Sequence, residues 1–403
     1  MSRQVLILTP EAPYPLHSGG AYRTASLVHY FARLADVDLI LLSESGQPAL
    51  LPKGLVRSQH VIPLPRNSRT TLARYFRNAR RAIRGVPPLI DRLSNLGEKI
   101  SAAIGQHRYD LGLVEHFWCA PYVKEMKVGC GKVILNLHNV ESALHARCAE
   151  TGSGLQAAGH RRFAAASRTL EAKLLPRFDV VLATSESDRA MTRTIAPGAR
   201  ISVYPNALPT VIVPRVAEDS NLIVFPGNFE YHPNVDATQF LVSEIWPLVK
   251  QQSSAARVRL VGRGDSFVRH LIPTQSNIDM TGPVDDAFGE IARAAVVVAP
   301  LRAGSGTRIK ILQAWAAARP VVATPLAAEG LDARDGENIL LAETPDRFAQ
   351  AIGSLLADTD SRNRIGAAGR QTFERHYTWS QAWKMLDQEL QVLCPPEPGG
   401  YTE

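Results

Sequence analysis

The sequence predicts an α/β protein with two doubly wound parallel-sheet domains, and three observations lead to this prediction. Short β-branched runs alternate with helix-length segments along the chain. The runs are apolar throughout, which is typical of parallel strands that helices cover on both faces. The alternation starts afresh after Tyr204-Pro-Asn206, where further prolines and the polar segment Glu218-Asp-Ser-Asn221 interrupt it. A chain of 403 residues is long enough for two such domains.

Each predicted strand is a short apolar run between helical or turn-forming segments. The strands are expected at Val5–Leu8, Val37–Leu42, Leu111–Val114, Val133–Leu137, Val180–Ala183, Ile201–Tyr204, Leu222–Phe225, Val258–Val261, Ile278–Met280, Val296–Ala299, Val321–Thr324 and Ile339–Leu341. Right-handed crossovers between them make a Rossmann-like sheet the expected architecture of each domain. We expect the domains at 1–207 and 208–378, followed by a segment 379–403 with an amphipathic helix and a Pro/Gly-rich tail.

The composition excludes several classes of protein. With 45% hydrophobic and 21% charged residues, the chain resembles neither a disordered nor a collagen-like sequence. No run approaches the roughly 20 apolar residues of a membrane-spanning helix. The run Val5–Leu8 is too short for the core of a signal peptide. Four cysteines without a CxxC pair predict neither a zinc site nor a disulfide framework, and therefore a cytosolic location.

The formal net charge of +7 is unevenly distributed. Residues 1–205 contain 27 Lys and Arg against 15 Asp and Glu, whereas residues 206–403 contain 18 against 23. The segment from Arg66 to Arg92 alone contains eight arginines and one acidic residue, Asp91. Its apolar residues Leu72, Tyr75, Phe76, Ala79 and Ile83 follow a helical spacing on an opposite face. Such a helix can lie on an anionic membrane surface or bind an acidic acceptor, and the alternative is a merely solvated helix. No RNA-binding motif accompanies it.

Two motifs of the first half follow predicted strands. Ser18-Gly19-Gly20 leads into a helix expected over Thr24–Leu34, and backbone N–H groups at such a turn can hold a phosphate or a sugar. The alternative is an ordinary strand–helix turn. His138 follows the strand Val133–Leu137, where it could orient a substrate hydroxyl or share a proton. A structural histidine is the alternative there. Ligands of open α/β sheets bind at this end of the strands.

The strongest motif is the glycine-rich segment Gly304-Ser-Gly-Thr-Arg-Ile-Lys310. It follows a predicted strand and opens a helix with Thr307 as the expected N-cap. Arg308 and Lys310 then lie at the helix N-terminus, where the helix dipole disfavours cations. Two cations there are explained if they neutralise a diphosphate. The alternative is that both long side chains extend into solvent. No GxSxG, HExxH, metal-binding DxD or dehydrogenase fingerprint accompanies these motifs.

Together, and in this order, the motifs make the chain similar to the retaining GT-B glycosyltransferases of the group 1 class (family 4). The matching segments are Pro13–Arg23, His138-Asn-Val-Glu141, Pro205-Asn206, Phe225-Pro-Gly-Asn228, His232-Pro-Asn-Val-Asp236, Leu260-Val-Gly262-Arg263-Gly, Thr281-Gly-Pro-Val-Asp285, Ala299–Lys310, Arg319–Thr324 and Glu329-Gly-Leu-Asp332. They extend over nearly the whole chain.

The resemblance implies that the N-terminal domain holds a glycan, glycolipid or other acceptor and the C-terminal domain a nucleotide-sugar donor. It implies transfer with retention and without a required metal or other cofactor, and a final helix that crosses back to the N-terminal domain. The implied catalytic residues are His138, Ser305 and Gln313. The implied donor-binding residues are Gly19, Gly20, Asn228, Arg263, Gly304, Gly306, Thr307, Arg308, Lys310 and Glu329. The acceptor or membrane surface would comprise Arg74, Arg77, Arg80, Arg81 and Arg84, with the protein cytoplasmic or peripheral on the inner face of a membrane.

The sequence departs from the family pattern at two places. Ser305 and Gln313 stand where the family has two glutamates eight residues apart. Gln313 can still accept hydrogen bonds from ribose hydroxyls, but the loss of a charge-assisted bond costs on the order of 1–2 kcal/mol. The usual Arg/Lys pair is absent around Asn228–Tyr231, so Arg308, Lys310 and Arg263 are expected to replace it. Three alternatives stay open: a protein that binds nucleotide sugar or a partner without transfer, a nucleotide-sugar 2-epimerase and, more remotely, a dehydrogenase.

Overall fold

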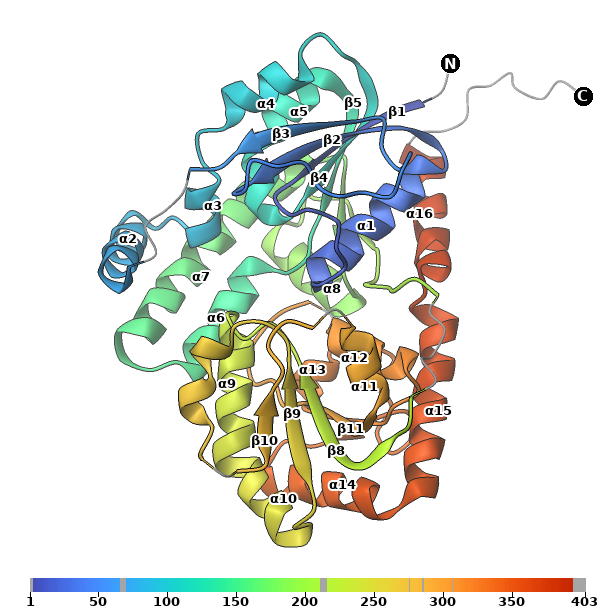
Figure 1. Ribbon diagram of the computed structural model, residues 1–403. Helices are drawn as coiled ribbons and strands as arrows, with labels where there is room; N and C mark the ends of the chain where they lie inside the picture. The colour runs from blue at the N-terminus through green and yellow to red at the C-terminus, as the bar shows by residue number, and fades with distance from the viewer. Residues whose placement is uncertain are drawn as a thin grey trace, which may run out of the picture. The chain divides into compact units, whose positions relative to one another are not determined.

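The computed structural model describes residues 3–65, 70–210, 216–274, 276–284, 286–306 and 308–393, except for the side chains of residues 71–75 and 82. The chain divides into two compact units (Figure 1). Unit 1 comprises Met1–Asn206 together with Ser380–Glu403, and unit 2 comprises Ala207–Trp379.

The described part of unit 1 contains one parallel sheet with the strand order β3-β2-β1-β4-β5-β6-β7. Its strands are β1 (Arg3–Thr9), β2 (Ala35–Ser43), β3 (Ser58–Pro63), β4 (Tyr109–Glu115), β5 (Cys130–Asn136), β6 (Val180–Ala183) and β7 (Ile201–Val203). Its helices are α1 (Gly19–Ala32), α2 (Thr71–Arg84), α3 (Pro88–Arg92), α4 (Gly97–Ile104), α5 (Val123–Gly129), α6 (Glu141–Thr151), α7 (Gly154–Leu174), α8 (Glu186–Ile195) and α16 (Trp379–Leu393). The central strands β1, β4 and β5 are almost completely buried, because helices cover both faces of the sheet.

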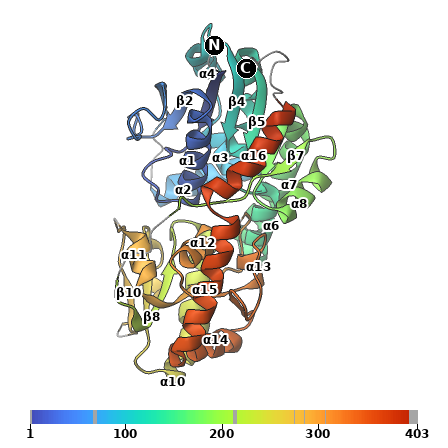
Figure 2. The same ribbon diagram turned by 90° about the vertical axis from the view of Figure 1, so that its right-hand side faces the viewer.

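Helix α16 lies beside α1, although more than 340 residues separate them in the chain (Figure 2). The Tyr30 hydroxyl donates to Asp387 over 2.6 Å, and the indole of Trp383 donates to the Ser26 carbonyl over 3.2 Å. Ser202 of β7 also donates to Glu389. The expectation that the final helix crosses back to the N-terminal domain is therefore confirmed.

Unit 2 repeats the same topology in its described residues, with the order β10-β9-β8-β11-β12-β13 and all neighbours parallel. The strands are β8 (Asp219–Pro226), β9 (Arg257–Val261), β10 (Ile278–Met280), β11 (Ala294–Ala299), β12 (Val321–Ala323) and β13 (Leu340–Leu341). The helices are α9 (His232–Phe240), α10 (Trp246–Gln252), α11 (Ala287–Ala292), α12 (Ile309–Ala316), α13 (Pro325–Ala328), α14 (Pro345–Ala357) and α15 (Thr359–His376). Helix α12 packs with α11 and α15, whereas α14 packs with α10, and both α12 and α14 contact β11 and β12.

All twelve expected strands are present, and the doubly wound fold class is confirmed. Strand β3 was not predicted from the sequence. This strand lies at the sheet edge, is polar at its start and buries little besides Ile62, so it lacks the apolar run that marks a central strand.

Two helix starts differ from the expectation. Helix α1 begins at Gly19 rather than Thr24, because the Ser18 hydroxyl caps it by accepting from the Ala21 N–H over 3.0 Å. Helix α12 begins at Ile309, and Arg308 occupies the cap position without a side-chain cap bond. Thr307, the expected N-cap, lies outside the described residues. Among the helices that the structure describes, none is both long and apolar enough to cross a membrane.

Candidate functional site

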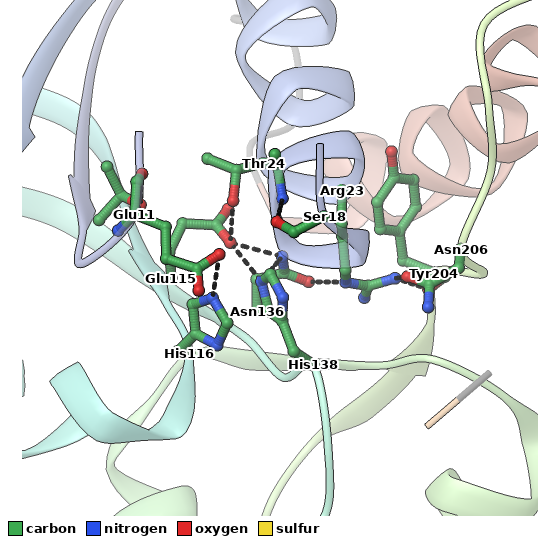
Figure 3. A network of polar contacts seen from close by, with 12 residues as sticks. Glu11, Ser18, Arg23, Thr24, Glu115, His116, Asn136, His138, Tyr204 and Asn206 are labelled. Carbon is green, nitrogen blue, oxygen red and sulfur yellow. Dashed lines mark hydrogen bonds and ion pairs between the residues drawn. The ribbon is translucent and has the colours of Figure 1, made fainter. Parts of the chain in front are cut away.

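In unit 1, a network of buried polar side chains gathers where β4 and β5 end (Figure 3). Glu115 is the last residue of β4, Asn136 is the last of β5, and His138 follows two residues later. Arg23 and Thr24 join them from α1. This is the edge of a parallel sheet at which α/β proteins bind their ligands.

Arg23 connects three segments of unit 1 and is 1% exposed. Its Nε donates to the Asn136 side-chain oxygen over 2.9 Å, and its Nη1 donates to the Tyr204 carbonyl over 2.6 Å and to the Asn206 side-chain oxygen over 3.1 Å (Figure 3). The guanidinium also lies over the Tyr204 ring at 4.7 Å. Burial lowers the pKa of Arg23 to about 10, so the guanidinium is still a cation at neutral pH.

Glu115 and His138 form the centre of the network. Glu115 Oε2 lies 2.7 Å from His138 Nε2 and accepts from the Asn136 amide over 2.9 Å and from the Thr24 hydroxyl over 3.2 Å. Burial raises the pKa of Glu115, whereas burial, His116 and Arg23 lower that of His138 well below its usual value. Both shifts favour neutral side chains, which suits a site for hydroxyl groups. Among the described residues, Arg23 Nη2 and Glu115 Oε1 have no hydrogen-bond partner, although buried polar atoms seldom lack one.

The ring of His138 belongs to a stack of three rings. The ring of His116 lies on it with centroids 3.5 Å apart and an interplanar angle of 22°. Trp118 lies on His116 at 4.2 Å and 13°, and its indole N–H donates to Glu141 Oε1 over 2.9 Å. His116 adopts φ 64°, a region that residues other than glycine rarely adopt.

Gly19 and Gly20, two expected donor-binding residues, form the first turn of α1. A Cβ atom on Gly20 would overlap the carboxylate of Glu11, whose Oε2 lies 3.8 Å from His116 Nε2. The structure therefore brings a carboxylate, not only backbone N–H groups, to the start of this helix.

A cavity of about 430 Å³ lies at the ends of β1 and β2. Tyr14, Ser43, Ser45 and Gln47 line it together with prolines, alanines and leucines. Glu44, its one charged lining residue, is ion-paired with Arg92. The Tyr14 hydroxyl lies 2.7 Å from His29 Nε2 of α1.

In unit 2, three loops follow β8, β9 and β11, and the first two approach each other through their backbones. The Gly227 N–H bonds to the Val261 carbonyl, and the Phe229 N–H bonds to the Arg263 carbonyl, both over 2.9 Å. Gly262 has φ 139°, and a Cβ atom there would overlap the Gly227 carbonyl oxygen. Only glycine permits this approach.

Two side chains hold the loop after β11 against α9. Arg302 makes a bidentate ion pair with Asp236, with Nη2 at 2.8 Å and Nε at 3.2 Å, and stacks on Phe240 at 4.5 Å. Lys310 Nζ donates to Asn234 Oδ1 over 2.8 Å and lies 4.3 Å from the centre of the Phe225 ring. Burial and the neighbouring Arg308 lower the pKa of Lys310 well below its usual value. Arg308 Nη1 donates to the Ser305 carbonyl. Both basic residues lie at the start of α12, Arg308 at the cap position and Lys310 in the first turn.

The remaining expected donor-site residues lie on the same loops and helices. Gly304 and Gly306 have φ 124° and 75°, Ser305 is buried between them, and Gln313 is half-buried in α12. Asn228 accepts from the Glu230 N–H over 3.0 Å and its carbonyl accepts from Asn234 over 2.8 Å. Arg263 is exposed, and Glu329 is half-buried directly after α13.

The basic segment forms α2, and two of its apolar side chains are exposed. Phe76 is 63% and Ile83 79% exposed. Arg81 bonds to Asp91 over 2.7 Å and Arg84 lies 3.9 Å from it, whereas Arg77 is half-buried and Arg80 exposed. The side chains of Arg74, Leu72 and Tyr75 lie outside the described ones, as do Arg66 and Arg69 altogether.

Arg23, Glu115, His116, Asn136 and Glu11 were not predicted from the sequence as site residues. The sequence pattern could have indicated two of them, because Glu115 and His116 directly follow a predicted strand, as His138 does. Among the described residues, no group of three or more His, Cys, Asp and Glu side chains is arranged to hold a metal ion.

Most of unit 2 matches a known protein family. Residues 220–358 match the family described as glycosyl transferases group 1, and they include β8, all three loops and α12. Most of unit 2 is therefore similar to the group 1 glycosyltransferases, and the chain has the GT-B fold of two parallel-sheet, Rossmann-like units.

Two curated proteins are similar to parts of the chain. An exopolysaccharide phosphotransferase of Streptomyces coelicolor is 28% identical over 188 residues, 44% of this chain and 20% of that protein. A phosphatidyl-myo-inositol mannosyltransferase of Mycobacterium leprae is 34% identical over 143 residues, 33% of this chain and 37% of that protein. The chain thus matches well under two thirds of the length of either relative.

Solved structures match over nearly the whole chain. Sucrose-phosphate synthase from Thermosynechococcus elongatus superimposes with a TM-score of 0.77 at 16% identity, covering 98% of this chain and 100% of that one. Anabaena HepE, solved with UDP and glucose, gives 0.65 at 13% identity and covers 97% and 100%. At these identities the likeness concerns the fold.

Proposed function

We propose that the protein is a retaining glycosyltransferase that moves a sugar from a nucleotide-sugar donor to a glycan, glycolipid or other glycoconjugate acceptor, without a required metal. The observation that carries the proposal is the pair of cations, Arg308 and Lys310, at the start of α12. They lie in the segment that matches the group 1 glycosyltransferases.

In this proposal, unit 2 binds the donor diphosphate at the loop of residues 300–308. The positive φ angles of Gly304 and Gly306 turn the backbone there, and Arg308 and Lys310 supply positive charge. During transfer, the bond between the anomeric carbon and a phosphate oxygen breaks and a bond to the acceptor oxygen forms. The acceptor proton leaves with the nucleoside diphosphate. Cations fixed near the leaving diphosphate stabilise the charge that develops on it.

Unit 1 supplies groups suited to hydroxyls. Glu115, His138 and Asn136 are buried and hold one another in place, and we assign to His138 the contact with the transferred sugar. Arg23 Nη2 and Glu115 Oε1 can bond ligand hydroxyls or water. The neutral cavity beside Tyr14 and Ser45 is our candidate for the acceptor sugar, because hydroxyls and apolar surfaces line it.

Helix α2 is proposed to contact an anionic membrane peripherally. Phe76 and Ile83 are exposed apolar side chains on a helix with five arginines, so they could enter the lipid surface while Arg77, Arg80 and Arg84 face the headgroups. Co-sedimentation should increase with the anionic lipid content of vesicles and fall for Phe76→Ser/Ile83→Ser. Binding that ignores anionic lipid would remove this part of the proposal.

The donor assignment is tested with a panel of UDP-, GDP- and dTDP-sugars, with and without EDTA. The HepE complex makes UDP-glucose the first donor to try. We expect slow release of the nucleoside diphosphate from at least one donor, unaffected by EDTA. Arg308→Ala/Lys310→Ala should abolish the nucleotide-induced rise in melting temperature, whereas Arg347→Ala, an exposed arginine of α14, should not. A thermal shift without any release would instead identify a protein that binds nucleotide sugar without transfer.

A further inference from the structure

The ring of His138 is held on its edge by one set of contacts and on its face by another. Glu115 and Asn136 contact Nε2, whereas the stack of His116 and Trp118 covers the ring face. From the stack we infer that Trp118 and Glu141 are positioning residues, which set the plane of the His138 ring for the transferred sugar. This inference rests on the function proposed above.

Glu141 is the anchor of the stack. It is the first residue of α6, it is 6% exposed, and its Oε1 accepts the indole N–H of Trp118 over 2.9 Å. Burial and the nearby Glu171 raise the pKa of Glu141 to about 8. Burying a carboxyl group costs free energy. A buried Glu141 that bonds the indole of Trp118 therefore indicates a functional role for this contact.

His116 transmits the position of the indole to His138. Its ring lies between the two others, with 13° to the plane of Trp118 and 22° to that of His138. Its backbone holds φ 64° because its N–H bonds to the Asn136 carbonyl over 3.0 Å and its carbonyl accepts from the Cys119 N–H over 3.1 Å. Such a conformation costs about 1–2 kcal/mol and persists only where surrounding contacts enforce it. Those contacts tie the turn to Asn136, which itself contacts His138.

The stack therefore links α6 to the candidate site through a hydrogen bond and two ring contacts. Contacts of this kind act on the geometry of the reacting groups and not on donor affinity. A misplacement of a catalytic group by about 1 Å can cost as much as 100-fold in rate. Changes at Trp118 and Glu141 should accordingly lower kcat and leave KM for the donor almost unchanged.

The test uses two matched pairs in the full chain. Trp118→Leu removes the ring, whereas Trp118→Phe keeps a ring but loses the N–H donor. Glu141→Leu removes the acceptor, whereas Glu141→Gln keeps a carbonyl that can accept the indole N–H. With the best donor, we expect kcat to fall about 10-fold for Trp118→Leu and about 3-fold for Trp118→Phe and Glu141→Leu. Glu141→Gln should behave like the unsubstituted protein, and KM should stay within about 2-fold throughout. If Trp118→Leu melts below the assay temperature, Trp118→Met replaces it.

A second readout does not depend on activity. In protein with ¹⁵N-labelled histidine, the ring signals of His116 and His138 are assigned through His116→Gln and His138→Gln. Trp118→Leu and Glu141→Leu should shift both sets of signals, and Glu141→Gln should leave them in place. Unchanged His138 signals in Trp118→Leu, or shifted signals with unchanged kcat, would overturn the positioning role. If the signals shift as expected but the unsubstituted protein releases nucleotide from no donor, the proposed function fails. The stack then positions the His138 ring without a role in sugar transfer.

Discussion

The two units share a sheet topology, and in both the candidate site lies at the carboxyl ends of the strands. The residues at this edge differ in chemical type between the units. Unit 1 places the buried side chains of Glu115, two histidines and Arg23 there, with the half-exposed Glu11 beside them. Unit 2 places glycines, backbone and two cations there, and its nearby acid Asp236 is already engaged by Arg302.

The difference follows from what each edge would bind. Hydroxyl groups need neutral donors and acceptors in fixed directions, which a self-bonded network of Glu115, His138 and Asn136 provides. A diphosphate needs a close approach to backbone N–H groups and positive charge, which a glycine-rich loop with Arg308 and Lys310 provides. Under the proposed function, the same scaffold would serve two ligand chemistries through the residues that follow its strands.

The largest expected effect concerns Arg23, on which the unit 1 network depends. Arg23→Met leaves Asn136, the Tyr204 carbonyl and Asn206 without their cation, so we expect unit 1 to lose about 3–5 kcal/mol of unfolding free energy. Calorimetry on the full chain measures this as a lowered transition. Arg3→Met, at an exposed arginine of β1, serves as the control. Equal melting of the two variants would show that the network contributes no stability.

The next effect compares a glycine of each edge. Gly262→Ala places a Cβ on a backbone carbonyl at positive φ and should cost about 2–4 kcal/mol, whereas Gly20→Ala meets only the movable carboxylate of Glu11 and should cost about 1 kcal/mol. Denaturant titration of both variants checks the order. A larger loss for Gly20→Ala than for Gly262→Ala would mean that the backbone after β9 adjusts to a Cβ atom more easily than the side chains around α1.

A substitution at Lys310 should raise the unfolding free energy, whereas those at Arg23, Gly262 and Gly20 lower it. Because the folded-state pKa of Lys310 is lowered, the unfolded chain binds more protons between that pKa and about 10.4, so stability rises with pH across this window. Lys310→Met removes the buried amine and should stabilise unit 2 by about 1 kcal/mol near neutral pH while weakening nucleotide binding. Thermal scans at several pH values, with and without nucleotide, measure both. If Lys310→Met is destabilised but still binds nucleotide, the bond from Lys310 to Asn234 is structural and Lys310 does not bind the diphosphate.

The smallest effect is expected on α2. Because Ile83 and Phe76 are exposed, Ile83→Ser and Phe76→Ser should change the unfolding free energy by no more than about 0.5 kcal/mol. Leu8→Ser, at a fully buried position of β1, provides the contrast. A large loss from Ile83→Ser would indicate that this side chain packs against protein after all.

Much of the fold was predictable because the central strands are apolar runs of the right length. Strands with long buried runs, such as β1, β4, β8 and β11, can be recognised in this way. The edge strand β3 lacks such a run, because Ile62 is its only fully buried side chain. The start of α1 was missed for a different reason: two glycines suggested a loop, but the Ser18 cap outweighs their low helix propensity.

The candidate site was predictable only where it follows a strand directly. His138 and the loop of residues 304–310 were found by that rule, and Glu115 and His116 obey it too. Arg23 could not be found, because its partners Asn136, Tyr204 and Asn206 are more than 110 residues away in the chain. Nor does local spacing show that Lys310 bonds Asn234, or that Asp91 turns Arg81 away from the surface of α2.

By itself, the sequence determined the two doubly wound units, because hydrophobic periodicity and glycine positions act within short stretches of chain. It also determined which loop concentrates cations at a helix start, since that loop is contiguous. Only the tertiary structure decided which polar groups are buried together, which histidines stack, and which apolar side chains of α2 remain exposed. These depend on contacts between distant segments, whose free energies no local pattern encodes.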